Sequence, residues 1–280
     1  RTDPNPHSPA SPPRPNATHT FCRLPHAART PQQPIFHRPH QEDVEPQNLR
    51  AFDSRHDVTK LSFHAVSHLL DSYCILNYGS ALGRGCGPLL ISREELSTAA
   101  LKNKRIAIPG RYTTAALLFR MFSPASNDLV EMRFEQIIDA VASGKVDAGV
   151  IIHESRFTYR QSGLVCLQDL GQWWEDFFDA PLPLGCIAVK RELGPLLREE
   201  AGRRIEASLQ WARSNPNACY PYIKHHAQET DDQVIDQHIE LYVNDFSVDL
   251  GEEGRRAVDM FFELGRQRGV LPLWSGSVFC

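Results

Sequence analysis

A histidine that closes an apolar run has suitable chemistry for a general base. In VDAGVIIHESRF, residues 146–157, the apolar stretch ends at His153. Ligands of open α/β sheets gather at the carboxyl ends of strands, and the ordinary pKa of histidine lies near working pH. His153 is therefore placed to remove a proton from a ligand. Glu154 and Arg156 either orient this ring or are solvated. From spacing alone, a structural histidine hydrogen-bonded at a strand end is the commoner alternative.

A Pro-Gly turn followed by two threonines has the pattern of an anion site. In RIAIPGRYTTAA, residues 105–116, a predicted strand leads into this turn and then into a helix whose first turn contains Thr113 and Thr114. Free backbone N–H groups and the partial positive charge of a helix N-terminus favour a carboxylate or a phosphate there. The alternative is that one threonine only caps the helix, and helix starts are far commoner than anion sites.

Two other segments give weaker signals for a binding site. Lys60, Leu61 and Ser62 end another apolar run and offer an ammonium group and a hydroxyl, although Ser62 would also serve as an ordinary helix cap. The Gly-rich segment 83–88 lacks the spacing of phosphate-binding and dinucleotide-binding loops. We therefore expect a turn or a hinge at the second segment.

The aromatic and histidine clusters favour structural roles. Aromatic residues at helical spacing more often pack into a core than cover a ligand. Histidines in the helical C-terminal part have no metal-ligand spacing and are expected at the surface. The residues concerned are Trp173, Trp174, Phe177 and Phe178 for the first group, and His225, His226 and His238 for the second.

The elements that must position these residues follow an α/β pattern. From residue 57 onward, short apolar runs alternate with stretches of helical period. Strands are predicted at 58–61, 73–77, 88–92, 105–109, 130–134, 148–153, 164–167 and 186–190. Helices are predicted at 113–122, 135–143, 195–214, 217–227, 231–239 and 252–268, and Gly144 is a suitable left-handed cap for the second.

The order of these elements predicts two lobes with a cleft between them. Residues 1–46 hold 11 of the 20 prolines and show almost no apolar periodicity, so we expect a disordered or loosely wrapped segment. Residues 47–90 together with 186–280 form the predicted lobe I, and 91–185 form lobe II. The crossovers fall near Leu90 and Gly185, and a cleft between such lobes is a common ligand site.

Composition restricts the class of protein. The chain has 280 residues, a net charge of −4 and an isoelectric point near 6.3, which gives no basis for a nucleic-acid partner or an anionic membrane surface. Seven single cysteines, without metal-finger spacing, favour a reducing compartment. The sequence contains neither a long apolar run nor a secretory signal. We expect a cytoplasmic protein with a small-molecule ligand; the oligomeric state does not follow from the sequence.

Five motifs together resemble one family of enzymes. They are TKLSF at 59–63, ALGRGCGP at 81–88, PGRYTTA at 109–115, GVIIHESRFTY at 149–159 and YVNDFSVDLG at 242–251. In this order and spacing they are similar to 1,4-dihydroxy-6-naphthoate synthase of menaquinone biosynthesis, from about residue 42 to about residue 271. The resemblance implies the type II periplasmic-binding-protein fold, in which two α/β lobes surround a central cleft.

The resemblance also implies a reaction and a set of site residues. The reaction is a carbon–carbon lyase step of the futalosine pathway, in which cyclic dehypoxanthinyl futalosine yields 1,4-dihydroxy-6-naphthoate and dihydroxyacetone without a metal or redox cofactor. The family's proton acceptor falls on His153. Its substrate-binding residues, which hold an aromatic carboxylate, fall on Lys60, Leu61, Ser62, Thr113 and Thr114.

The N-terminal segment departs from the family pattern. Members open with an apolar strand and SPCPNDT, whereas this chain has SPPRPNAT at 11–18 and HTFCRLPH at 19–26. Two other functions stay open on the same fold. One is a solute-binding protein without catalysis, and the other is the chorismate dehydratase of the same pathway.

Overall fold

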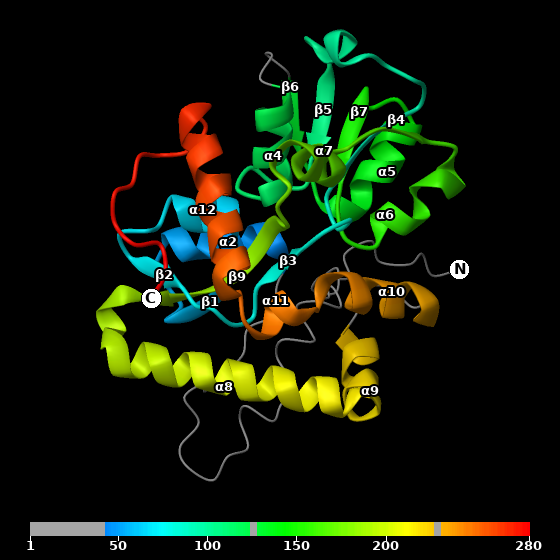
Figure 1. Cartoon of the computed structure of the whole chain (residues 1–280). Helices are drawn as coiled ribbons and strands as arrows, with labels where there is room; N and C mark the ends of the chain where they lie inside the picture. Colours follow the sequence, from blue (N-terminus) through cyan, green and yellow to red (C-terminus); the bar gives the residue numbers. More distant parts are fainter. Residues whose placement is uncertain (1–42, 124–127, 227–230) are drawn as a thin grey trace, which may run out of the picture.

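The computed structural model describes residues 43–123, 128–226 and 231–280, which form two β-sheets (Figure 1). In the first sheet a long strand, β9 (Leu182–Lys190), pairs antiparallel with β1 (Val58–Ser62), β2 (Tyr73–Ile75) and β3 (Ala81–Gly83). The second sheet has five strands in the order β6 (Asp128–Glu131), β5 (Arg105–Ile108), β7 (Ala148–Ile151), β4 (Leu89–Ser92) and β8 (Val165–Asp169).

Strand direction separates the two halves of the second sheet. β5 runs parallel to β6 and β7, whereas β4 runs antiparallel to β7 and β8. The chain enters this sheet between β3 and β4 and returns to the first sheet at β9. How these sheets divide the chain into domains stays a prediction.

Helices cover both sheets, and the helices of residues 194–248 follow one another along one side of the molecule (Figure 1). The α-helices are α2 (Val44–Phe52), α3 (Phe63–Ser67), α4 (Thr114–Phe122), α5 (Phe134–Ala142), α6 (Ser155–Thr158), α7 (Leu170–Phe178), α8 (Gly194–Ser214), α9 (Pro216–His226), α10 (Asp232–Tyr242), α11 (Asp245–Val248) and α12 (Gly251–Gln267). Short 3₁₀ turns are η2 (Thr98–Leu101), η3 (Tyr159–Ser162) and η4 (Arg191–Leu193). None of the helices in the described ranges is long and apolar enough to cross a bilayer.

Every predicted strand and helix overlaps an element of the structure, whereas β3 was not predicted and several boundaries differ. The strand expected at 130–134 ends at Glu131, because the buried Phe134 is already the first residue of α5. The loose segment expected at 1–46 ends earlier, since α2 begins at Val44 and the Asp43 side chain accepts a hydrogen bond from its N–H. Residues 1–42 lie outside the described residues.

The Gly-rich and aromatic segments pack together beside β4. Gly83 ends β3, so the turn expected at 83–88 begins one residue later. A Cβ atom at Gly87 would overlap the backbone of Gly171, the second residue of α7, and this close approach requires glycine on both sides. Core packing is confirmed for Trp174, which is fully buried, whereas Phe177 is 68% exposed.

The C-terminal tail adds a parallel partner beside β2. Ile75 N donates to Val278 O at 2.9 Å, and Cys280 N donates to Ile75 O at 3.1 Å. A disulfide joins Cys74 to Cys280, so the expectation of single thiols is wrong for this pair. The two cysteines are 206 residues apart in the sequence, and spacing alone carries no sign of such a pairing.

Candidate functional site

His153 lies just beyond the carboxyl end of β7, as the sequence predicts. Its φ of 56° places it in the left-handed region, which costs a non-glycine residue on the order of 1 kcal/mol, and residues held in this way cluster at functional sites. Three rings surround its imidazole: Phe134 at 5.2 Å, His238 at 5.8 Å and Tyr242 at 6.4 Å between ring centroids. The side chain is therefore held at the end of a strand inside an aromatic enclosure.

Burial controls the charge of His153. Burial and, to a smaller extent, the positive charge of Lys60 together lower the pKa of the imidazole from 6.5 to about 3. Lys60 belongs to β1 of the first sheet, whereas His153 follows β7 of the second. The structure thus brings two predicted site residues from different sheets close enough to interact, and it keeps the imidazole neutral at working pH.

His238 is a buried residue, and the surface position expected for it is wrong. It is 0% exposed, and its pKa lies well below 6.5 because of burial, with smaller effects from His153 and Lys60. Ile235 and Tyr242, the other buried residues of α10, lie three positions before it and four after it, so all three share one helical face. That apolar spacing is the sequence signal that could have identified His238 as buried.

The threonine pair lies at the start of α4, where it was predicted. Thr113 is the N-cap: its Oγ1 accepts from Ala116 N at 3.2 Å and donates to Gly110 O at 2.8 Å. Thr114 Oγ1 donates to Leu184 O of β9 at 2.7 Å. Both hydroxyls therefore already have backbone partners. Thr113 Oγ1 already accepts from Ala116 N, so the N–H groups of Thr114 and Ala115, which have no acceptor within the helix, are the donors best placed for an anion.

Two residues of α2 that the sequence did not single out hold this turn. Glu45 Oε1 accepts from Tyr112 N at 2.9 Å, and Asn48 Nδ2 lies 3.3 Å from Tyr112 O and 3.1 Å from Glu45 Oε2. A Cβ atom at Gly110 would overlap the Glu45 side chain, so the turn requires glycine at this point, where φ is +146°. Burial raises the pKa of Glu45, and the Tyr112 N–H and Asn48 partly offset this shift.

Asn48 also joins the turn to the end of β1. Its Nδ2 lies 3.1 Å from Ser62 Oγ, and its Oδ1 accepts from Ser62 N at 3.0 Å. Ser62 precedes α3 but makes no side-chain capping bond to it. The hydroxyl of Ser62 is thus oriented by α2, while the neighbouring Leu61 is buried in the core. The predicted segments 60–62 and 113–114 are brought together by one buried amide.

Arg156 has another role than orienting His153. Its guanidinium pairs with Asp169 at 3.0 Å and donates to the Gly87 carbonyl. It therefore fastens the loop after β7 to the Gly-rich segment and to β8. Within the described ranges, no group of three or more His, Cys, Asp or Glu side chains is arranged to hold a metal ion.

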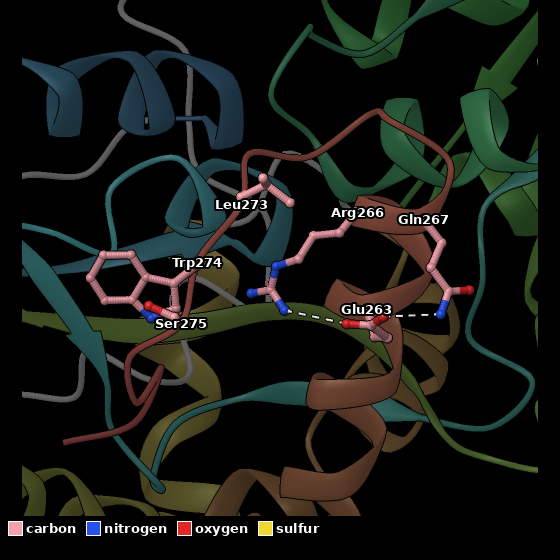
Figure 2. Close-up of a pocket in the computed structure, with 6 residues that line it drawn as sticks. All are labelled: Glu263, Arg266, Gln267, Leu273, Trp274 and Ser275. Atoms are coloured by element: carbon pink, nitrogen blue, oxygen red, sulfur yellow. Dashed lines mark hydrogen bonds and ion pairs between the residues drawn. The ribbon is translucent and has the colours of Figure 1, made fainter.

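Two surface hollows lie elsewhere on the molecule. One is lined by Glu263, Arg266 and Gln267 of α12 and by Leu273, Trp274 and Ser275 of the tail (Figure 2). Figure 2 shows Glu263 between Arg266 and Gln267, whose amide donates to it at 3.0 Å. An adjoining hollow shares the same face of α12. Neither contains a predicted site residue, so the site is defined by side-chain chemistry and not by the size of a surface hollow.

The chain is similar to proteins of known family. A family model described as "Menaquinone biosynthesis" matches residues 10–267. A 1,4-dihydroxy-6-naphthoate synthase from Thermus thermophilus is 43% identical over 258 residues, covering 92% of this chain and 93% of the relative. One from Streptomyces coelicolor is 40% identical over 265 residues, covering 93% of each.

A solved structure gives the fold. The alkanesulfonate-binding protein SsuA from Xanthomonas axonopodis pv. citri matches with a TM-score of 0.62 at 15% identity, covering 94% of this chain and 96% of that one. The two sheets and their helices therefore have the α/β architecture of periplasmic binding proteins, as the sequence predicts.

Proposed function

The chain belongs to the menaquinone biosynthesis family, and on that premise we propose that it is a 1,4-dihydroxy-6-naphthoate synthase. The single observation that carries the proposal is the 43% identity, over 92% of the chain, to a relative of that name. The proposed reaction is a carbon–carbon lyase step that splits cyclic dehypoxanthinyl futalosine into 1,4-dihydroxy-6-naphthoate and dihydroxyacetone.

His153 is the proposed general base. A neutral imidazole at the end of β7, held by rings from α5 and α10, is able to accept the proton whose removal starts the fragmentation. Its left-handed backbone conformation supports a functional role. General bases of this kind contribute about 10²- to 10⁴-fold to a rate.

The proposed carboxylate site combines the start of α4 with the end of β1. The first-turn N–H groups of α4 attract an anion, and Thr113, Thr114 and Ser62 surround them with hydroxyl groups whose positions are fixed by Gly110, Leu184 and Asn48. Lys60 adds a positive charge from β1, and Leu61 anchors that strand in the core. An aromatic carboxylate fits this combination of charge and donors.

Substrate binding is expected to strengthen the base. A pKa near 3 leaves the ligand-free imidazole with little affinity for a proton. A carboxylate bound beside Lys60 would offset the positive charge that disfavours the imidazolium form, so the proton affinity of His153 would rise when the substrate is present. The neutral resting state and the stronger bound state together suit proton removal.

The test is an assay of the purified protein with cyclic dehypoxanthinyl futalosine and, separately, with chorismate. Formation of 1,4-dihydroxy-6-naphthoate and dihydroxyacetone from the first compound supports the proposal. Loss of water from chorismate would identify the dehydratase instead. Tight binding of either compound without any conversion would identify a solute-binding protein, which the likeness to SsuA makes the leading non-enzymatic alternative.

A further inference from the structure

A second imidazole is buried next to the proposed base. His238 lies on α10, its ring centroid is 5.8 Å from that of His153, and the two planes meet at 71° in an edge-to-face arrangement. Tyr242, one turn further along α10, lies 4.5 Å from His238 and 6.4 Å from His153. One helix thus supplies two of the three rings around His153, and Phe134 of α5 supplies the third.

The position of His238 is unusual for a residue with only a structural role. It is fully buried, and a buried polar ring stabilises a core less than an apolar ring of similar size. Its neighbours on the same helical face, Ile235 and Tyr242, already provide the apolar packing. A second neutral imidazole at this point therefore indicates a purpose connected with the ring that it touches.

We propose that His238 is a positioning residue for the base: it closes the His153 ring off from water on the α10 side and so keeps that imidazole neutral and in one orientation. The inference rests on the proposed function, in which His153 accepts a proton. The inference means that α10, in the C-terminal helical part of the chain, contributes to the site around His153. Residues 60–62 and 113–114 do not enclose the His153 ring on this side.

Several charged and titratable groups lie near His153 and His238, and each of them can affect a measured protonation constant. Lys60 of β1 disfavours the protonated form of both histidines. Glu154 follows His153 directly, and burial raises the pKa of Tyr242. The groups acting on Tyr242 are Cys86, Arg156, Glu154 and Asp169. A variant of His238 leaves all of these groups in place, so a shift measured for His153 reports on the enclosure itself.

The experiment compares His238→Ala, which opens the enclosure, with His238→Phe, which keeps a ring there. The protonation of His153 is followed by NMR of ring-labelled histidine, and kcat/KM is measured against pH. For His238→Ala we expect the protonation constant of His153 to increase at least tenfold, because water reaches the ring. The acid limb of kcat/KM should then move to higher pH by the same factor in proton concentration. For His238→Phe we expect both to stay near the values of the unaltered protein. His225→Gln, at an exposed position of α9, is the matched control.

The outcomes separate this inference from the proposed function. A lower rate in His238→Ala with an unchanged protonation constant and an unchanged acid limb would show a merely structural role and overturn the inference. If His238→Ala does not fold, His238→Gln tests the same point, because its amide leaves part of the ring volume open to water. Absence of turnover in the unaltered protein would refute the synthase, while the NMR titration would still decide the role of His238.

Discussion

Two histidines of this chain have similarly lowered pKa values and different surroundings. Burial lowers the pKa of both His64 and His153 to about 3. His64 lies on α3, is 1% exposed, and its Nδ1 donates to Thr113 O at 3.1 Å, so it holds the threonine turn. His153 keeps part of its surface exposed at a strand end and faces rings and a lysine.

The difference between them shows that a shifted pKa does not by itself identify a base. His64 uses a ring nitrogen in a fixed bond to the backbone, and its further neighbours are the rings of His68 and Tyr112. His153 combines burial with a left-handed backbone and with access from the end of a sheet, where ligands bind. Position in the fold therefore assigns the chemistry, and the pKa only describes the protonation state.

Replacing each histidine with glutamine should separate catalysis from support. We expect His153→Gln to lower kcat by about 10²- to 10⁴-fold, equal to about 3 to 5 kcal/mol, because no group remains to take the proton. His64→Gln keeps a donor near Thr113 and should act mainly on KM. Steady-state kinetics with correctly folded variants measures both. Equal losses of kcat in the two variants would contradict the assignment of different roles.

Removing the disulfide between Cys74 and Cys280 should lower stability without affecting either histidine. Cys280→Ser should lower the free energy of unfolding by about 2 to 4 kcal/mol under oxidising conditions, because a cross-link between residues 206 apart no longer restricts the unfolded chain. Urea denaturation with and without a thiol reductant measures this difference. Cys166→Ser, which removes a free thiol, is the control. A changed kcat per folded molecule would mean that the tail also supports the site.

The sequence predicts the strand end at His153 and the threonine turn beside His64 better than it predicts the contacts between distant segments. Short apolar runs and their Gly or Pro boundaries located eight of the nine described strands, all except β3, and the end of one strand pointed to His153. Thr113 and Thr114 were found because a turn and a helix start are local patterns. Each of these features depends on residues close together in the chain.

Contacts between distant segments were outside the reach of local patterns. Glu45 meets Tyr112 across 67 positions, and Asn48 connects Ser62 to the same turn, so neither residue looks functional until the fold is known. His238 could have been placed in the interior from its spacing to Ile235 and Tyr242, but its partner His153 could not. Tertiary proximity, not residue type, determines these roles.

The threonine turn can be tested without touching either histidine. Replacing Thr113 and Thr114 together with valine removes the bonds to Gly110 O and Leu184 O and the hydroxyls around the proposed carboxylate site. We expect KM to rise about tenfold, since the two bonds that fix this turn contribute about 0.5 to 1.5 kcal/mol each and the N–H groups that face the carboxylate lose their positions without them. Thr114→Ser keeps the hydroxyl and should retain most of the affinity. An unaltered KM in the valine variant would show that this turn does not bind the substrate carboxylate.

The smallest effect is the dependence of stability on pH, and it should be common to both histidines. The unfolded chain protonates a histidine near pH 6.5, whereas the folded chain resists protonation down to about pH 3. Between these values the unfolded state binds more protons, so the free energy of unfolding falls as the pH falls. Each histidine should account for about 1 kcal/mol between pH 7.5 and 5.5. Urea denaturation at the two pH values should show this loss reduced in His64→Gln and reduced similarly in His153→Gln, although only the second variant loses most of its kcat. A slope that neither substitution changes would mean that both rings are accessible to protons in the folded protein, and the shared pKa on which the comparison depends would be wrong.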